Sequence, residues 1–369
     1  MVDINGYEIK SAFSGGEPLK AIYSLGEKVW PVDQPVEFGG LKFTALENGT
    51  IGMTHNGTNA TTTKPYISYS KDGVNWIEWD YTNITVDSGD FVYFKGVNNR
   101  ISSGSSQMNY STFTSTGKIS ASGNIMSLLY GDDYEDKLSL IGNSYCFYRL
   151  FYNCKSLTTA PSLPATKLAT LCYYDMFYNC ESLTTAPELP ATTLAGSCYY
   201  HMFYGCTSLL NAPELPATTL SNGCYDGMFS VCSSLTTAPS LPATKLSTLC
   251  YYNMFYGCES LATAPALPAT TLAESCYDSM FYGCSSLTTA PELPATTLAN
   301  GCYKYMFRNC TKLNYVKANF TTEPSSTYTK YWLDGVASTG TFIANPDATW
   351  TTTIERNEST VPAGWTIQK

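Results

Sequence analysis

Fourteen cysteines are the residues of this sequence best suited to chemistry, because thiolates bind metals, cycle between redox states and form disulfides. Metal sites and redox pairs usually place cysteines two residues apart or recruit histidines, whereas here the cysteines of each pair are eight residues apart. Across a helix such a pair would be separated by roughly 12 Å, too far for a disulfide. We therefore expect reduced thiols packed as small hydrophobic side chains, with disulfides between copies of the pair as the alternative. The pairs are Cys146 and Cys154, Cys172 and Cys180, Cys198 and Cys206, Cys224 and Cys232, Cys250 and Cys258, Cys276 and Cys284, and Cys302 and Cys310.

Histidines and carboxylates offer little for catalysis. The two histidines are His55 and His201, and the position of His201 carries Asp, Gly, Asn or Ser in other copies of the pattern. Glu188, Glu214 and Glu292 recur at one position, but Ser or Ala replaces them elsewhere. General acid–base catalysis needs two carboxylates in contrasting environments, and no such pair is apparent. We therefore expect a protein that is not an enzyme and that has no metal site and no cofactor.

Tyrosines are the stronger candidates for a binding surface. They recur two and six residues after the first cysteine of a pair, and tyrosine offers a large amphipathic area at low entropic cost. Such rows would suit a protein interface or the face of a sugar. The alternative is that the rings stack on one another as the outer layer of the fold. The candidate residues are Tyr148, Tyr152, Tyr174, Tyr178, Tyr200, Tyr204, Tyr252, Tyr256 and Tyr282.

These cysteines and tyrosines belong to a sequence repeat of 26 residues. CYYDMFYNCESLTTAPELPATTLAGS, residues 172–197, begins again at residues 198, 224, 250, 276 and 302, and a truncated forerunner begins at residue 146. A fixed period between roughly 20 and 50 residues is the signature of a solenoid, and 26 falls in the range of leucine-rich repeats. No copy can bury its apolar side chains alone, so stacking explains the repetition.

The first nine residues of each copy predict a short helix, because their apolar side chains share one face of a helical wheel. A threonine-rich extended stretch follows, which Pro187 ends because proline cannot donate a backbone hydrogen bond. We therefore expect an α/β leucine-rich-repeat solenoid of seven 26-residue repeats, stacked about 5 Å apart. In the second copy the inward residues should be Cys172, Tyr173, Met176, Phe177 and Cys180, and the outward residues Tyr174, Asp175 and Tyr178.

The flanking sequences predict further units. Residues 36–120 contain short alternating runs, such as LKFTAL and DFVYFKG, which predict a small Ig-like β-sandwich. Residues 121–145 should form an N-terminal cap rung, because the open end of a solenoid exposes apolar surface. After the solenoid of residues 146–316, residues 317–369 should form a β-rich C-terminal cap. Residues 1–35 are then a short N-terminal β attachment segment.

Composition narrows the possible partners. The formal net charge is −9, whereas nucleic acid demands a basic surface. No apolar run approaches the roughly 18 residues of a membrane span. The first residues lack the basic and apolar stretches of a secretory signal. We therefore expect a chain that folds in the cytoplasm where it is made, or one from which a leader has been removed.

The motif M-F-Y-x-C-x-S-L-x-x-A-P-x-L-P, present between residues 146 and 310, resembles the BspA-like leucine-rich repeats and the 26-residue repeats of bacterial surface proteins. That resemblance implies a secreted adhesin that binds host proteins or other cells. LKAIYSLGEKVWPV, near the N-terminus, resembles a hairpin common in phage and prophage structural proteins. The GVASTGTF stretch and the P-x-G-W-T ending resemble tails found with such repeats in proteins of gut bacteria and their phages.

Together these resemblances imply a virion-associated adhesion protein, such as a tail fibre, head fibre or decoration component, that is assembled in the bacterial cytoplasm. Its partners would be other virion proteins, bound through residues 1–35, and a glycan or protein of the host surface. A homo-oligomer is left open. The alternatives are a secreted adhesin on the bacterial cell surface and a purely structural spacer.

Overall fold

The structure is a computed structural model of the 369-residue chain. It describes residues 38–56, 64–102, 109–321, 323–348 and 360–369, together with the backbone of six short N-terminal strands. These strands pair as three antiparallel hairpins. Apart from that backbone, the predicted attachment segment lies outside the described residues. The strands are β1 (Val2–Ile4), β2 (Tyr7–Ile9), β3 (Phe13–Ser14), β4 (Glu17–Pro18), β5 (Ile22–Ser24) and β6 (Glu27–Trp30).

Eight strands form two antiparallel sheets that pack face to face. The sheet orders are β10-β9-β12-β7-β14 and β11-β8-β13. The Phe113 ring centroid of the smaller sheet lies 4.9 Å from that of Phe43 and 5.2 Å from that of Phe94 in the larger sheet. Trp79 is buried beside Phe94, whereas Trp76 is only half-buried. The strands are β7 (Lys42–Ala45), β8 (Gly49–Asn56), β9 (Ile67–Ser70), β10 (Ile77–Glu78), β11 (Ile84–Val86), β12 (Phe91–Gly96), β13 (Tyr110–Ser115) and β14 (Ile119–Ser122).

The repeats contain no helix, so the predicted α/β class is wrong. Within the described residues the one helix is α1 (Ser127–Tyr130), which precedes the repeats. The first part of each copy is a run of tight turns. In the second copy the backbone is left-handed at every fourth residue: φ is 59° at Leu171, 52° at Asp175 and 54° at Asn179. A left-handed residue ends a right-handed helix, so the chain winds in a series of turns instead.

Backbone hydrogen bonding explains why this conformation is stable. The N–H of Met176 donates to the carbonyl of Tyr173 within the same turn (3.2 Å). The N–H of Phe177, the next residue, donates to the carbonyl of Met202 in the following copy (2.9 Å). This alternation runs from Leu171 to Cys180, so every second N–H is bonded to the neighbouring copy. A helix would bond every N–H internally, and here the ladder between copies replaces it.

The threonine-rich stretch also differs from the single strand expected in each copy. It forms isolated parallel bridges between copies, such as Thr159 to Thr185 and Asn211 to Thr237. A proline follows closely in each of the first six copies, for example Pro187 after Thr185. Because proline lacks an N–H, the pairing cannot extend into a longer strand.

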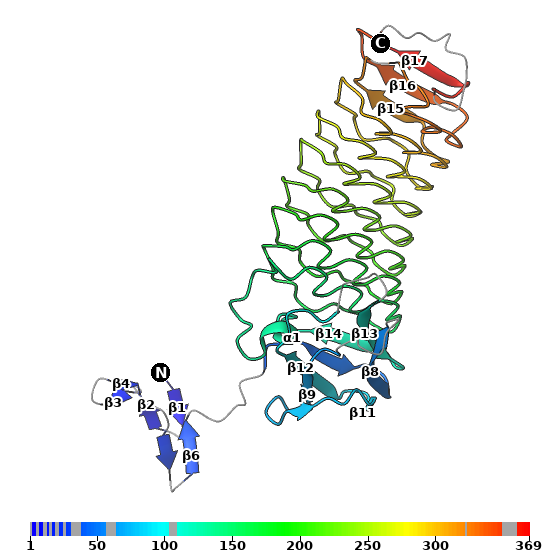
Figure 1. The fold of residues 1–369 in the computed structure, drawn as a ribbon. Helices are drawn as coiled ribbons and strands as arrows, with labels where there is room; N and C mark the ends of the chain where they lie inside the picture. Colours follow the sequence, from blue (N-terminus) through cyan, green and yellow to red (C-terminus); the bar gives the residue numbers. More distant parts are fainter. Residues whose placement is uncertain are drawn as a thin grey trace.

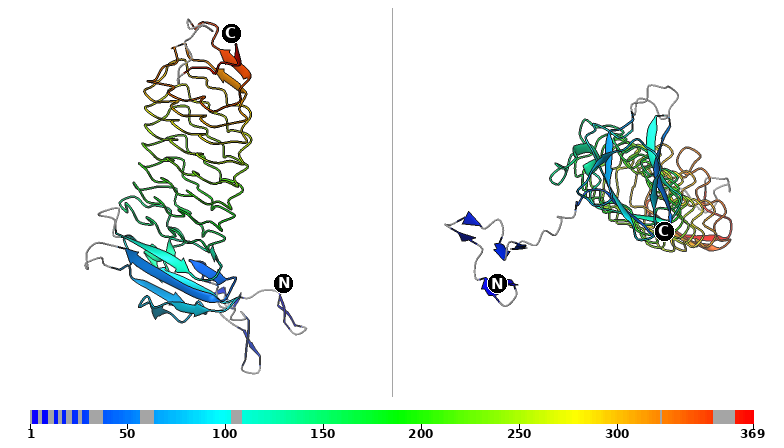
Figure 2. Two further views of the ribbon diagram at one scale, coloured as in Figure 1. Left: turned by 90° about the vertical axis from the view of Figure 1, so that its right-hand side faces the viewer. Right: turned by 90° about the horizontal axis from the view of Figure 1, so that it is seen from below.

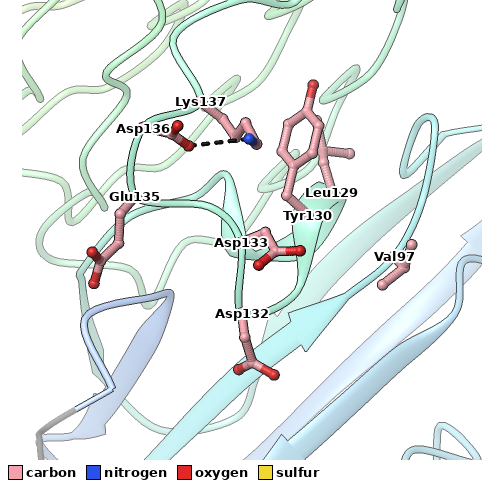
Figure 3. A pocket seen from close by; sticks show the side chains of 8 residues that line it. All are labelled: Val97, Leu129, Tyr130, Asp132, Asp133, Glu135, Asp136 and Lys137. Atoms are coloured by element: carbon pink, nitrogen blue, oxygen red, sulfur yellow. Dashed lines mark ion pairs between the residues drawn. The ribbon is translucent and has the colours of Figure 1, made fainter.

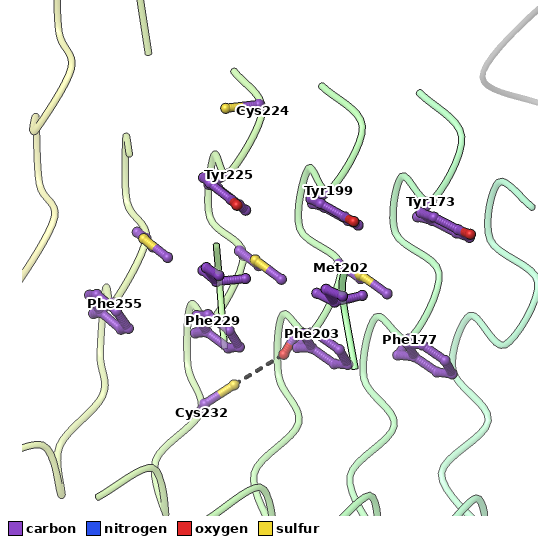
Figure 4. Packing of buried hydrophobic residues seen from close by; sticks show 14 of the residues in the cluster. Tyr173, Phe177, Tyr199, Met202, Phe203, Cys224, Tyr225, Phe229, Cys232 and Phe255 are labelled. Atoms are coloured by element: carbon purple, nitrogen blue, oxygen red, sulfur yellow. Dashed lines mark hydrogen bonds between the residues drawn. The ribbon is translucent and has the colours of Figure 1, made fainter. Parts of the chain in front are cut away.

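Side chains of successive copies stack in columns inside the coils (Figure 4). The phenylalanine column is fully buried, and the ring centroids of Phe177 and Phe203 lie 5.5 Å apart with an angle of 2° between the ring planes. The rings of Tyr173 and Tyr199 form a parallel column with a spacing of 5.8 Å. All five residues expected to face inward in the second copy are buried. This confirms the predicted core and the predicted spacing of about 5 Å.

The stack of coils continues beyond the seven copies at both ends (Figures 1 and 2). At the C-terminal end, the Phe307 N–H donates to the carbonyl of Trp332 (2.9 Å). There β15 (Tyr315–Ala318), β16 (Gly340–Ala344) and β17 (Trp365–Gln368) form a parallel sheet. At the other end, the N–H of Phe113 in β13 donates to the carbonyl of Leu150 (2.8 Å). The sandwich and the coils therefore share one continuous hydrophobic core.

Val231 is poorly suited to the left-handed backbone, because its side chain is β-branched. Val231 has a φ of 60°, whereas the equivalent residues of the other copies are Asn or Gly, which tolerate this conformation. Replacing Val231 with Asn should stabilise the chain by about 1 kcal/mol, since a β-branched side chain is strained there. The neighbouring Gly257 leaves room for the amide, as Gly205 does for Asn179. Urea unfolding of Val231→Asn, with Val231→Ala as control, measures the gain; a loss of stability in Val231→Asn would contradict this reading.

Candidate functional site: the tyrosine face

The candidate tyrosines lie on the turn side of the coils, and we call this surface the tyrosine face. Its rings stack along the coil axis. Tyr178 and Tyr204 have centroids 4.5 Å apart with parallel planes, and Tyr174 and Tyr200 are 4.3 Å apart at 10°. A second group lies further along, where the Tyr256 and Tyr282 centroids are 4.6 Å apart. All of these rings are half-buried.

This stacking decides which chemistry the tyrosines can perform. Their flat faces cover one another, so inside a column they are not available to stack on the face of a sugar. Ring edges and hydroxyl groups remain for hydrogen bonding with a ligand. Desolvation by burial, with the neighbouring tyrosines, raises the pKa of Tyr178 to about 12, so the hydroxyl stays protonated and can donate. The outer layer of stacked rings, which the sequence left open as the alternative, is therefore present, and its hydroxyl groups and ring edges give it a polar surface.

Tyr148 does not belong to the accessible surface that the sequence predicts. Its residue exposure is 0%, because Tyr110 of β13 and Tyr145 pack edge-on against its ring. The guanidinium of Arg149 lies 5.0 Å from the ring centroid of Tyr148 and 4.6 Å from that of Tyr152. The sequence reading missed Tyr110, since nothing local shows that β13 lies beside the first copy.

The tyrosine face is interrupted at the fourth copy. Asp226 and Ser230 stand where the flanking copies carry tyrosines, and both are buried. Tyr252 has no tyrosine neighbour in its own column, because Asp226 and Asp278 occupy the adjacent positions. The accessible face therefore consists of two parts, residues 152–204 and residues 252–282.

A row of charged groups runs beneath the first part. The prediction that Asp175 faces solvent is wrong: its side chain is 4% exposed, and its Oδ2 accepts a hydrogen bond from Nε of Arg149 at 2.9 Å. Burial raises the pKa of Asp175 to about 6, although Arg149 opposes the shift. Asp226 is buried without an arginine, which raises its pKa to about 8. His201 is 23% exposed and lies between the two carboxyl groups.

The other histidine takes no part in this row. His55 lies on β8 of the sandwich, where its Nδ1 and the hydroxyl of Ser111 form a hydrogen bond of 2.9 Å. Burial lowers its pKa to about 4. The two histidines therefore belong to different parts of the fold.

A pocket of about 580 Å³ lies where α1 approaches the end of β12 (Figure 3). Its apolar side includes Val97 and Leu129. Two of its carboxyl groups are paired, since Lys95 contacts Asp132 at 2.8 Å and Lys137 contacts Asp136 at 3.1 Å. The other two acidic residues of the lining, Asp133 and Glu135, make it negative.

The cysteines lie in the core as free thiols, all fourteen buried. From the second copy on, the second cysteine of a pair donates from Sγ to a backbone carbonyl of the previous copy, as Cys206 does to Phe177 (3.2 Å). Burial raises the pKa of Cys206 well above its usual range, which suppresses the reactive thiolate. Among the described residues, no three His, Cys, Asp or Glu side chains are grouped so that they could hold a metal ion. The described part of the chain likewise contains no helix long and apolar enough to cross a membrane.

Comparison with known proteins identifies the family. The sequence profile described as "BspA type Leucine rich repeat region (6 copies)" matches residues 143–287 and 248–331, which together span just over half of the chain. The chain therefore belongs to the BspA-type leucine-rich repeat family.

Similarity to individual proteins is weaker. A solved leucine-rich repeat protein from Bacteroides ovatus ATCC 8483 is similar at 17% identity and a TM-score of 0.29. The match covers 62% of this chain and 67% of that one. No curated protein matches the chain significantly.

The two cysteine columns should respond differently to serine. In Cys206→Ser the new hydroxyl can donate to the carbonyl of Phe177, as the thiol does now. Cys198 makes no such bond within the described structure, so Cys198→Ser buries an unpaired hydroxyl and should cost about 1–3 kcal/mol. Urea unfolding should show Cys198→Ser to be the less stable variant. Equal losses would mean that the thiol hydrogen bond is unimportant.

Thiol accessibility provides a second measurement. Native protein should react with very few equivalents of a thiol reagent, because the thiols are buried and protonated. After denaturation without reductant, close to fourteen equivalents should react. A low count in the denatured state would reveal disulfides between copies.

Proposed function

We propose that this chain is a leucine-rich-repeat solenoid that acts without catalysis as an adhesion protein, recognising a host-surface glycan or protein through the tyrosine face. The observation that carries the proposal is the rigid order of that face. Ladder hydrogen bonds fix each copy against the next, so the hydroxyls of Tyr152, Tyr178 and Tyr204 stand in a row at the coil spacing. A row of prearranged donors and acceptors loses little entropy on binding.

The chemistry of the face favours a ligand rich in hydroxyl or amide groups. Because the ring faces are covered, recognition would use hydroxyls and ring edges, and a polar glycan or a polar protein surface suits these groups. Equivalent contacts repeat along the coils, so weak contacts add up along one rigid surface. The membership in the BspA-type family supports the same role.

For the location, we propose a virion, with residues 1–35 binding other virion proteins and the coils directed outward. The N-terminal segment contains three hairpins, β1–β2, β3–β4 and β5–β6, whereas the repeats form coils. This difference supports a separate role for the N-terminal segment. The bacterial cell surface is the alternative address, and a spacer without a ligand is the alternative role. Whether the chain forms a homo-oligomer is open in each case.

Removing hydroxyls without removing rings tests the binding face. The double variant Tyr178→Phe and Tyr204→Phe keeps the stacked column, and it should weaken binding to host cells or arrayed glycans about tenfold, at roughly 0.5–1.5 kcal/mol per lost hydrogen bond. The matched control is Thr236→Val with Thr237→Val on the exposed threonine stretch. If only the threonine variant loses binding, the ligand is bound by the other side of the coils.

Deletions test the role of each part. Removing residues 1–35 should leave a folded chain that no longer joins its particle, because the described residues from Leu41 onward form a shared core of their own. Particles whose chains lack the repeats should assemble normally, but they should attach poorly to host cells. Normal attachment would identify the coils as a spacer. Recovery of the full chain on a bacterial envelope would favour the cell-surface alternative.

A further inference from the structure

Four ionisable side chains from four successive copies form one row along the coil axis. Arg149, Asp175 and His201 occupy the same position of the first, second and third copies, and Asp226 lies one position earlier in the fourth. Arg149 Nε lies 2.9 Å from Asp175 Oδ2. His201 Nδ1 is 3.7 Å from Asp175 Oδ1, and His201 Nε2 is 4.0 Å from Asp226 Oδ1. The imidazole thus stands between two carboxyl groups.

The fourth copy is shaped to receive this imidazole. A Cβ added to Gly227 would lie 2.2 Å from Cδ2 of His201 and 2.5 Å from Nε2, so any side chain at position 227 would collide with the ring. Gly227 also has a φ of 55°, which glycine adopts without strain. The N–H of His201 donates to the carbonyl of Asp226 at 2.8 Å, which fixes the two residues side by side.

The two carboxyl groups are incompletely satisfied. The side chains of Asp175 and Asp226 are 4% and 10% exposed, and neither Oδ1 has a hydrogen-bond partner. A buried oxygen without a partner is costly, and an ionised one more so. The other titratable groups that face the imidazole are the phenols of Tyr178, Tyr200 and Tyr204, whose ring centroids lie within 6.2 Å of the imidazole centroid. None of these groups is a cation. The negative charge of Asp226 would therefore have to be neutralised by a proton.

We propose that the buried pair of His201 and Asp226 carries one proton at neutral pH and so forms a latch between the third and fourth copies, which opens in mildly alkaline solution. With the proton in place, the pair of His201 and Asp226 has no net charge, whether the proton lies on the imidazole or on the carboxyl group. Without it, a buried carboxylate faces a neutral imidazole. The latch is a property of the free chain and does not depend on the proposed binding role.

The direction of the pH dependence follows from the two shifts. Burial raises the pKa of Asp226 to about 8 and lowers that of His201 to about 4, so the folded pair takes up its first proton near pH 8. In an opened chain the first proton binds to free histidine, near pH 6.5. The closed state therefore holds one extra proton between about pH 6.5 and 8, and its advantage is lost as the pH rises through that window. Asp175, with a pKa raised to about 6, changes at lower pH.

Hydrogen exchange at single amides tests the latch. The informative amides are those of His201 and Gly227, which bond to carbonyls of the next copy, Asp226 and Tyr252. After correction for intrinsic exchange, their opening constant in the full chain should rise about tenfold per pH unit from pH 6.5 to 8 and then level off, as the loss of one proton requires. Asp226→Asn should abolish this rise, because an amide cannot ionise.

A matched control is available in the sixth copy. Asp278 occupies the same position as Asp226 and is also buried, but its Oδ1 accepts a hydrogen bond from Ser279 at 2.8 Å. Its pKa is raised to about 6, below the window of the latch. Asp278→Asn should therefore retain the rise at His201 and Gly227. If Asp226→Asn keeps the rise, or if Asp278→Asn also abolishes it, there is no latch at this site.

The resonances of the His201 ring give an independent readout. In the native chain they should shift with a midpoint near pH 8, because the ring lies beside the carboxyl group of the pair that loses its proton there, and His55→Asn assigns the signals. In Asp226→Asn that midpoint should fall below the value of free histidine, since burial alone then acts on the ring. A His201 ring that does not respond between pH 7 and 9 would overturn the proposal.

Discussion

The backbone hydrogen bonds between coils are the interaction on which the rest of this structure depends. Every second N–H of the turn segment is bonded to a carbonyl 25 residues later, as Phe177 is to Met202. A ladder of this kind permits one register, because a slip by one residue would exchange bonded for unbonded groups. The 26-residue repeat therefore keeps each N–H of the turn segment opposite the carbonyl to which it is bonded.

Register turns single residues into columns. Because each position stands above its counterpart, the buried phenylalanines, tyrosines and cysteines each form a row with a constant environment. The same rule operates at the ends, where β13 and β14 of the sandwich and the β15–β16–β17 sheet take the place of a neighbouring coil. The apolar ends of the array are therefore covered by the units that flank it, in a single core.

Register also governs the outer surface. It stacks the candidate tyrosines face to face, so the surface offers hydroxyls and edges where isolated rings would offer flat faces. A residue that differs in one copy therefore changes the surface only at that place. Asp226, for example, ends the column that Tyr174 and Tyr200 form and introduces a buried carboxyl group. His201 and Gly227 fit that carboxyl group from the adjoining positions. The proposed latch therefore lies where the repeat is irregular.

The sequence by itself determined the repeat, the buried columns with their spacing of about 5 Å, the free thiols and the tyrosines as surface candidates, because these follow from which residue types recur at which period. It did not determine the conformation of the turn segment. Apolar residues at Cys172, Met176 and Cys180 recur every four residues, and over nine residues that period is indistinguishable from the 3.6 residues of a helix. Asn or Gly at the eighth position of most copies, such as Asn179 and Gly205, was the available signal for a left-handed backbone. Only the tertiary structure decided that Tyr148 is covered by Tyr110, and that Asp175 and Asp226 are buried on either side of His201. These contacts join residues that are far apart in the chain, and they exist only once the coils are stacked in register.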